Sequence, residues 1–372
     1  MSEADQVATM KGISVIGCVH RSASSAADWV VSAGLQGYKL APRRLPEWNA
    51  DLMSRDTLFI TDLHGNLSAL RRAVERAEQV APLCYLVLGG DLAPNLVMVR
   101  LRDGDFVLRH EACYGPKVAD DFRARLREGR HYKPEDQHGK HPLAYAIELD
   151  VAAFLELGDD ETRALLERPS SFDFLRERQR EFVAGELLPL LRRYRDEGKE
   201  VFVMLGNDDF ADLEAPVLEE ERLGNLSYVH GRVCPLGRSQ ILGYSCVLSK
   251  PFRYRYWERS EEQIGQELSA LTAGRDPARL LLSIHMPPHG TNLDMLWPDG
   301  RHVGSRAVRA VLEARRFGIG LFGHIHESHL ISGSRHDRVG GTLVINAGGY
   351  HDSECCAVIF DAANPEDWRG LW

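Results

Sequence analysis

Residues 57–66 of this 372-residue chain read TLFITDLHGN. The run at 57–61 is rich in β-branched and large apolar side chains, which predicts a strand, and Asp62 and His64 follow it directly. Other apolar runs also end in polar residues. In open α/β sheets, ligand sites gather beyond the carboxyl ends of the strands, so we expect these loops to converge. They are Gly90-Asp91 after 84–88, Gly206-Asn207-Asp208-Asp209 after 200–205, His285 after 280–284, and Gly323-His324-Ile325-His326 after 318–322.

Strands and helices alternate along most of the chain. Further strands are expected at 240–246, 343–345 and 357–360, and a long helix at 174–194 that Pro189 kinks or interrupts. Ser260 and Gln263 form a possible capping box for a helix at 261–273. This alternation predicts an α/β fold. One apolar stripe marks another helix: Leu67, Leu70, Val74 and Ala77.

Two regions interrupt this pattern. Residues 1–55 hold one expected strand, at 13–19, and resemble an N-terminal appended segment. Residues 103–171 contain no convincing strand and carry helical patterns such as 143–157, together with a polar loop at 130–141. We therefore divide the chain into segment 1–55 and one domain, 56–372, interrupted by a helical insertion at 103–171.

Composition excludes several classes of protein. The chain has 45 Lys and Arg against 54 Asp and Glu, a formal charge of -9, so it has no net positive field for non-specific nucleic-acid binding. No apolar run approaches the roughly 18 residues that span a bilayer, and the first residues show no signal peptide. The seven cysteines are an odd number without C-x-x-C spacing, which favours free thiols. We expect a cytoplasmic protein with no membrane partner.

The side chains of the strand-end loops favour a metal site. Imidazole with carboxylate suits the divalent ions of manganese, iron, cobalt, nickel and zinc, and the absence of thiolate argues against a structural zinc cluster. A carboxylate that bridges two ions about 3.5–4 Å apart can clamp both oxygens of a phosphoryl displacement. Taken singly, each loop has a plainer interpretation, as a turn or a surface histidine.

The five motifs in this order resemble the calcineurin-like metallophosphoesterase family. The resemblance covers the core and implies a four-layer α/β/β/α sandwich with two divalent transition-metal ions, for which manganese is favoured. It implies that Asp62, His64 and His326 bind one ion, that Asn207, His285 and His324 bind the other, and that Asp91 bridges both. Asn346-Ala347-Gly348 resembles the family's closing strand and turn, although a plain β-turn explains it equally well.

One departure from the family pattern concerns catalysis. Many members have a histidine at the position of Asp208, and an aspartate at the position of Pro94 that orients it. In the family that histidine is assigned to protonating the leaving oxygen, so this chain would either favour a leaving group that departs readily or use another acid, for which Asp208 and His289 are the candidates. Other histidines could approach the site from a lid, although exposed loops are their plainer interpretation: His131, His138, His141, His329 and His351.

The function that follows is a dinuclear metal-dependent phosphoesterase in which a metal-bound hydroxide attacks phosphorus. Its partner would be a small phosphorylated substrate, and Asp208 in place of the histidine favours a phosphodiester or an activated phosphate. The alternatives on the same core are a phosphomonoesterase, a protein phosphatase or a nuclease. A non-catalytic scaffold is the alternative from another class, and the complete set of seven ligands argues against it.

Overall fold

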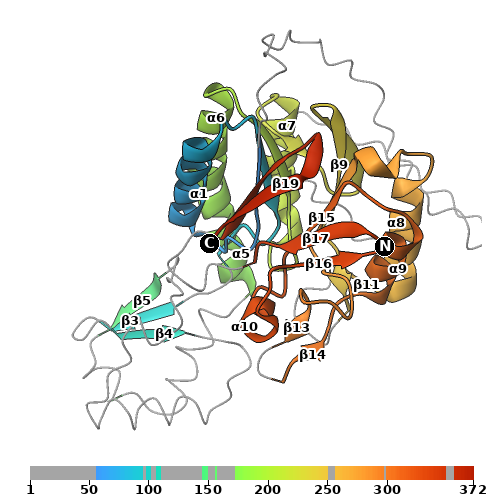
Figure 1. The fold of residues 1–372 in the computed structure, drawn as a ribbon. Helices are drawn as coiled ribbons and strands as arrows, with labels where there is room; N and C mark the ends of the chain where they lie inside the picture. Colours follow the sequence, from blue (N-terminus) through green and yellow to red (C-terminus); the bar gives the residue numbers. More distant parts are fainter. Residues whose placement is uncertain are drawn as a thin grey trace, which may run out of the picture. The chain divides into compact units, whose positions relative to one another are not determined.

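The computed structural model describes residues 56–94, 98–101, 106–109, 145–149, 156, 172–249, 256–296, 299–348 and 356–372. Within these residues the chain forms a mixed α/β structure with two six-stranded sheets and flanking helices (Figure 1). The expected segment 1–55 with its strand at 13–19 lies outside the described residues, and so do His131, His138, His141 and His351.

The first sheet has the order β19-β18-β1-β2-β6-β7. Strands β1, β2, β6 and β7 run parallel to one another, and β18 and β19 are antiparallel to their neighbours. The parallel strands are continuous apolar runs because both of their faces are covered. The bounds are β1 Thr57–Ile60, β2 Tyr85–Gly89, β6 Glu200–Met204, β7 Ser227–Tyr228, β18 Ala357–Asp361 and β19 Asn364–Leu371.

The second sheet has the order β16-β17-β15-β12-β9-β8. Its central strands β9, β12, β15 and β17 are parallel, and the two edge strands are antiparallel. The bounds are β8 Arg232–Leu236, β9 Ser239–Tyr244, β12 Leu280–Ile284, β15 Ile319–Phe322, β16 His336–Val339 and β17 Thr342–Asn346. Every strand expected in the two sheets is present, with ends that differ by no more than two residues.

The helices follow from local signals in the sequence. Ser260 caps α8 with a full capping box: its side chain accepts from the Gln263 N–H, and its own N–H donates to the Gln263 side chain. Pro189 lies at the start of α6, directly after a π-helical turn at Val183–Leu187 that interrupts the expected long helix. The bounds are α1 Leu67–Val80, α5 Phe172–Phe182, α6 Leu188–Asp196, α7 Glu214–Arg222, α8 Glu261–Thr272, α9 Arg306–Ala314 and α10 Ser328–Ser332.

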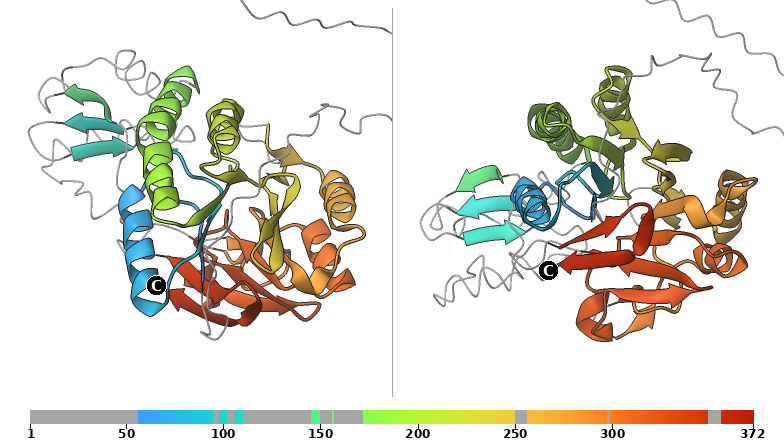
Figure 2. Two further views of the ribbon diagram at one scale, coloured as in Figure 1. Left: turned by 90° about the horizontal axis from the view of Figure 1, so that it is seen from above. Right: turned by 45° about the horizontal axis from the view of Figure 1, so that its top comes forward.

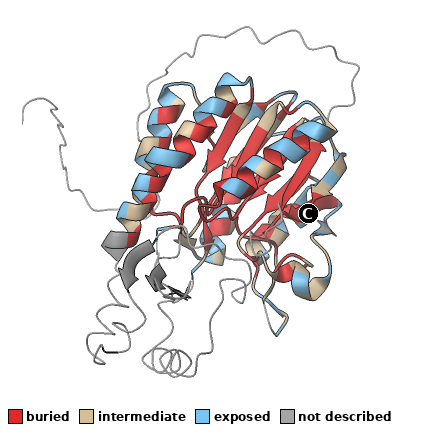
Figure 3. Cartoon of the chain, turned by 90° about the vertical axis from the view of Figure 1, so that its left-hand side faces the viewer, coloured by how far each residue is buried: buried red, intermediate tan, exposed pale blue. Residues whose placement is uncertain are grey.

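Alternation along the strands divides the core into two parts. Phe59 of β1 and Leu281 of β12 belong to a cluster that joins residues of both sheets, so the sheets face each other. Leu58 and Leu282, one residue away, belong instead to the cluster that includes the helices. Figures 1 and 2 show α1 and α6 on the outer side of one sheet and α8 and α9 on the outer side of the other, and Figure 3 shows buried strands between helices whose outer faces are exposed.

The expectation of a purely helical insertion at 103–171 is wrong in part. Two strands occur there, β4 (Phe106–Arg109) and β5 (Tyr145–Leu149), and both pair with β3 (Met98–Leu101). The segment 145–149 reads YAIEL, whose apolar residues alternate with a period of two, and the helical spacing seen at 143–157 obscured this shorter pattern. Most of the remaining insertion lies outside the described residues.

Two two-stranded ribbons lie in loops of the second half. One pairs β10 (Val247–Leu248) with β11 (Glu258–Arg259), and the other pairs β13 (Met295–Leu296) with β14 (Arg301–His302). No described helix is long and apolar enough to cross a membrane. Among the described residues, Cys84, Cys234 and Cys246 are free thiols, which agrees with the cysteine pattern as far as these three residues go.

Candidate metal centre

The register of the parallel strands brings the predicted loops to one edge of the first sheet. Because β1, β2 and β6 are adjacent and parallel, the residues after them are neighbours. The backbone N–H of Asp62 donates to the carbonyl of Gly90 at 3.0 Å, and that of His64 donates to the carbonyl of Asp91 at 2.8 Å. The Asp-x-His loop is thus fixed to the Gly-Asp loop by main-chain hydrogen bonds.

Loops of the second sheet join this edge from the other side. His285 Nδ1 lies 3.0 Å from the carbonyl oxygen of Gly89, and the backbone N–H of His324 donates to Asp62 Oδ1 at 3.0 Å. The Gly323 N–H donates to the carbonyl of His285 at 3.1 Å. The site therefore forms where the ends of the two sheets meet.

Two groups of side chains at this edge could hold a metal ion, and both contain Asp91. One group is Asp62, His64 and Asp91, and the other is Asp91, His285 and His324; within each group the donor atoms all lie within 4.8 Å of one another. His285 Nε2 is 3.2 Å from Asp91 Oδ2, and His64 Nε2 is 3.9 Å from the same oxygen. His324 is half-buried and the other four side chains are buried.

The remaining two predicted ligands lie beside these groups. Asn207 Oδ1 is 3.1 Å from His285 Nε2, and the ring of His326 is 5.8 Å, between centroids, from the ring of His64. The structure thus brings all seven predicted ligand residues to one edge. Their role as ligands stays a prediction.

The backbone at these loops is unusual. Four described residues other than glycine have a positive φ angle: Asp62 at 52°, His64 at 42°, Asp91 at 49° and His324 at 63°. All four belong to the groups that could hold a metal ion. A left-handed conformation is uncommon for such residues and persists only where the surroundings impose it, which is typical of functional sites.

Two glycines are required because neighbouring carboxylates lie too close to them for any side chain. A Cβ atom on Gly206 would lie 2.2 Å from Asp91 Oδ1, and one on Gly323 would lie 2.4 Å from Asp62 Oδ2. Both distances are far below van der Waals contact. The glycine that precedes Asn207 and the one that precedes His324 therefore leave space for the two carboxylates.

The buried charges at this edge are strongly coupled. Burial raises the pKa of Asp62 to about 7, and the Asp91 charge adds to this shift. Burial also opposes ionisation of Asp91, but the His285 and His64 imidazoles outweigh it and hold the pKa of Asp91 below its ordinary value. For His285, burial is outweighed by Asp91 and Asp62, which raise its pKa to about 10. A proton on His285 therefore occupies the place that a cation would take.

Asp208, one of the two predicted acids, lies at the rim of this group. Its Oδ2 is 3.9 Å from His64 Nδ1, its Oδ1 accepts a hydrogen bond from Asn207 Nδ2 at 2.8 Å, and its side chain is 23% exposed. Its backbone N–H donates to Asp91 Oδ1 at 2.8 Å. Asp208 thus touches two predicted ligand side chains.

The next residue, Asp209, has a structural role that the sequence analysis missed. Its buried carboxylate accepts hydrogen bonds from the backbone N–H groups of Leu92, Ala93 and Gly206, at 2.8 to 3.0 Å. Burial, together with the Asp91 charge, raises the pKa of Asp209 to about 7. Asp209 ties the loop that follows Asp91 to the loop that carries Asn207.

Gln179 of α5 joins the same loops and was also missed. Its Nε2 donates to the carbonyls of Pro94, at 3.0 Å, and Asp208, at 2.7 Å, and its Oε1 accepts from the Phe210 N–H at 2.9 Å. Asp208 and Pro94 stand at the positions where many members of the resembled family have a histidine and the aspartate that orients it. A buried amide on a neighbouring helix connects these positions instead.

His289, the other predicted acid, contacts a different set of residues. Its Nδ1 lies 3.7 Å from Asp294 Oδ2, and His302 Nδ1 lies 2.8 Å from Asp294 Oδ1. Asp294 is fully buried and also accepts from the N–H groups of Gly290, Thr291 and Gly304. The sequence analysis did not identify Asp294 or His302, because no regular spacing relates them to the metal motifs.

Comparison with known proteins adds little. No family model and no curated protein matches the chain. One similar solved structure covers 86% of this chain and 100% of its own, at 15% identity and a TM-score of 0.49. The structure of TT1561 of Thermus thermophilus covers 84% of this chain and 96% of its own, at 13% identity and a TM-score of 0.43. Both scores lie below 0.5, so neither likeness supports a conclusion.

Metal binding should release protons. His285 and part of the Asp62 population hold a proton near neutral pH, because their pKa values are raised to about 10 and about 7. Since a cation must displace these protons, we expect between about one and two protons released per chain at pH 7, and tighter binding as the pH rises from about 6 to about 9. Calorimetric titration with Mn²⁺ in buffers of different ionisation enthalpy measures this. Affinity independent of both pH and buffer would contradict it.

Proposed function

We propose that the chain is a metal-dependent phosphoesterase that binds two divalent ions at this edge and hydrolyses a phosphodiester or an activated phosphate ester. Its two sheets and outer helices would then be the α/β/β/α sandwich of the calcineurin-like metallophosphoesterases. The observation that supports this proposal is the membership of Asp91 in both donor groups. One shared carboxylate keeps two cations close enough to act on one phosphoryl group.

The chain's own residues prepare this site for cations. His285 Nδ1 donates to the carbonyl of Gly89, which leaves Nε2 directed at Asp91 as the nitrogen available to a metal. The Asp62 carboxylate is fixed by the His324 N–H, and Asp91 Oδ1 by the Asp208 N–H. When bound, the ions would activate a water molecule and offset charge on the phosphoryl oxygens.

Asp208 favours diesters over monoesters. Its carboxylate lies beside His64 and is partly exposed, at the rim where substrate would arrive. A phosphomonoester carries up to two negative charges near neutral pH and a diester carries one, so the nearby carboxylate repels the monoester more strongly. The alternatives on the same core are phosphomonoesterase activity and protein-phosphatase activity. A substrate screen distinguishes both from diester hydrolysis.

Three side chains are candidates for the proton donor to the leaving group. Asp208 and His289 are the two predicted from the sequence, and His302 is added because a buried carboxylate orients its ring. The loop that carries His289 and His302 begins directly after His285, and a Pro288–Ser305 bridge closes it. Asn346 Nδ2 holds the carbonyl of Leu293, in this loop, beside those of Gly323 and Ile325, which flank His324.

The buried carboxylates of this site argue against a non-catalytic scaffold. A scaffold gains nothing from the close pair of buried carboxylates Asp62 and Asp91, because burying a charge costs free energy unless it is paired. Both residues are buried, and both have a left-handed backbone. These costs are understandable if bound cations offset them.

Replacement of Asp91 should damage both ion sites at once. We expect the wild-type protein loaded with Mn²⁺ to approach two ions per chain, and Asp91→Asn to lose most of this metal and at least about 10²-fold in kcat/KM toward an activated phosphodiester. Elemental analysis and steady-state kinetics measure the two effects. Asp299→Asn, in an exposed loop, is the matched control. Full metal occupancy in Asp91→Asn would refute the bridge.

The rate should depend steeply on the leaving group. Without the family's histidine, aryl phosphodiesters should react much faster than alkyl ones, and general-acid help is typically worth 10²–10⁴-fold. Asp208→Ala, His289→Gln and His302→Gln should leave the aryl rate within severalfold of wild type. A selective loss of the alkyl rate in one variant would identify the donor, and His336→Gln serves as the surface control. A rate independent of the leaving-group pKa would contradict this account.

A further inference from the structure

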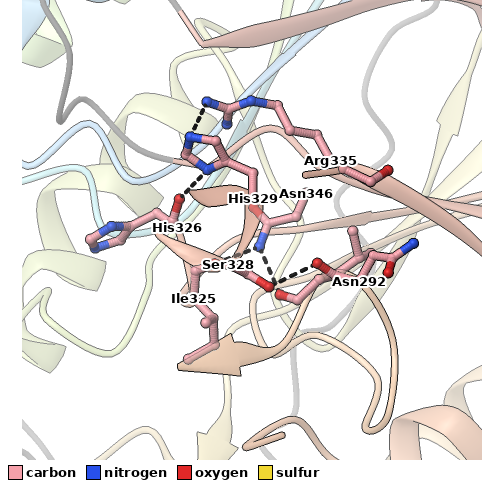
Figure 4. A pocket seen from close by; sticks show the side chains of 9 residues that line it. Asn292, Ile325, His326, Ser328, His329, Arg335 and Asn346 are labelled. Carbon is pink, nitrogen blue, oxygen red and sulfur yellow. Dashed lines mark hydrogen bonds between the residues drawn. The ribbon is translucent and has the colours of Figure 1, made fainter. Parts of the chain in front are cut away.

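A small polar pocket opens beside the predicted ligand His326 (Figure 4). It lies between the loop that carries His326, the start of α10, and the segment that leads into β16. Figure 4 shows Arg335, His329 and His326 connected in sequence by hydrogen bonds. The pocket's lining residues include His326, His329, Arg335 and Asn346.

Arg335 is fixed by main-chain oxygens and one imidazole. Its Nη1 donates to the carbonyls of Ala347, at 3.1 Å, and Gly348, at 2.7 Å, and its Nη2 lies 2.9 Å from His329 Nε2. The guanidinium carbon also lies 5.3 Å from the centroid of the Trp372 ring. The planar group therefore has a fixed position and orientation.

The partners of His329 determine its tautomer. A guanidinium can only donate, so His329 Nε2 must accept the Arg335 hydrogen bond and cannot carry a proton. His329 Nδ1 therefore carries the proton and donates to the carbonyl oxygen of His326 at 2.9 Å. His329 is a neutral connection between the cationic Arg335 and the backbone of a predicted metal ligand.

Asn346 binds the same loop through the loop's backbone carbonyls. Its Nδ2 donates to the carbonyls of Gly323 and Ile325, each at 3.1 Å, and its Oδ1 accepts from the Gly348 N–H at 2.9 Å. Gly348 is the residue whose carbonyl Arg335 also binds. Arg335, through His329 and through Gly348, thus reaches the His324–His326 loop by two routes.

We propose that Arg335 and His329 are positioning residues that hold the His326 backbone and thereby set the affinity of the ion that His326 helps to bind. This inference rests on the proposed function in taking His326 as a ligand of one of two ions. The guanidinium thus acts on the His326 backbone through a neutral imidazole. Partners that orient metal ligands typically contribute 10–100-fold to metal affinity.

Stepwise Mn²⁺ titration of the full chain tests this proposal. We expect Arg335→Ala to weaken one of the two binding steps by about 10–100-fold and to leave the other within about threefold of wild type. Added guanidinium should restore most of the weakened step. Arg338→Ala is the matched control, because Arg338 lies three residues away, is exposed and pairs with Glu366. Arg335→Ala with both steps unchanged, or both weakened equally, would overturn the proposal.

Substitution of His329 separates the connection from simple packing. His329→Gln keeps one donor and one acceptor and should retain most of the affinity, whereas His329→Leu, of similar bulk, should weaken the same step as Arg335→Ala. Equal affinity in these two variants would contradict the proposed connection.

Nitrogen NMR provides a test that no variant's folding can affect. In wild-type protein with ¹⁵N-labelled histidine, His329 should carry its proton on Nδ1, and a proton on Nε2 would overturn the proposal. Metal titration also separates this inference from the proposed function. If wild-type protein binds two ions and hydrolyses no phosphate ester, the proposed function fails while the titrations still decide the role of Arg335.

Discussion

The carboxylate of Asp91 is the interaction on which the site depends. It lies after β2 of the first sheet, is 3.2 Å from His285 of the second sheet, accepts the Asp208 N–H, and belongs to both groups that could hold a metal ion. A buried carboxylate is costly unless positive charge or donors surround it, and the raised pKa of His285 supplies that charge as a proton. The two facing sheets bring these loops together. The buried negative charge of Asp91 then favours binding of cations between them.

The local geometry shows what this arrangement costs. Asp62, His64, Asp91 and His324 hold left-handed backbone, and two glycines are needed because carboxylate oxygens fill the space of their missing side chains. Each strained residue costs about 1–3 kcal/mol, and the surrounding structure must compensate. Four side chains that bind the main chain of these loops contribute to that compensation: Asp209, Gln179, Asn346 and Arg335. They stabilise the loops on which the predicted ligands lie.

The sequence predicted the strands of the two sheets and the loops that follow them well, because the signals for strands and loops are local. The apolar run at 57–61 and the capping box at Ser260 need only neighbouring residues to be recognised. Asp209 and Gln179 could not be assigned in this way, because they bind backbone groups distant in sequence, and such contacts leave no spacing pattern. Asp294 binds nearer backbone groups, but their spacing is irregular and matches no motif. The YAIEL strand was missed because five residues of alternation competed with a longer helical pattern. The resemblance supplied a predicted ligand set, and in the structure Asp91 is the residue that belongs to both groups that could hold a metal ion.

Anomalous diffraction from crystals of the Mn²⁺-loaded protein shows how many ions bind at Asp91. We expect two peaks about 3.5–4 Å apart, both in contact with the Asp91 carboxylate, with Asp62 and His64 beside one and His285 and His324 beside the other. A single peak, or two peaks of which only one contacts Asp91, would contradict the shared carboxylate and the two-ion site built on it.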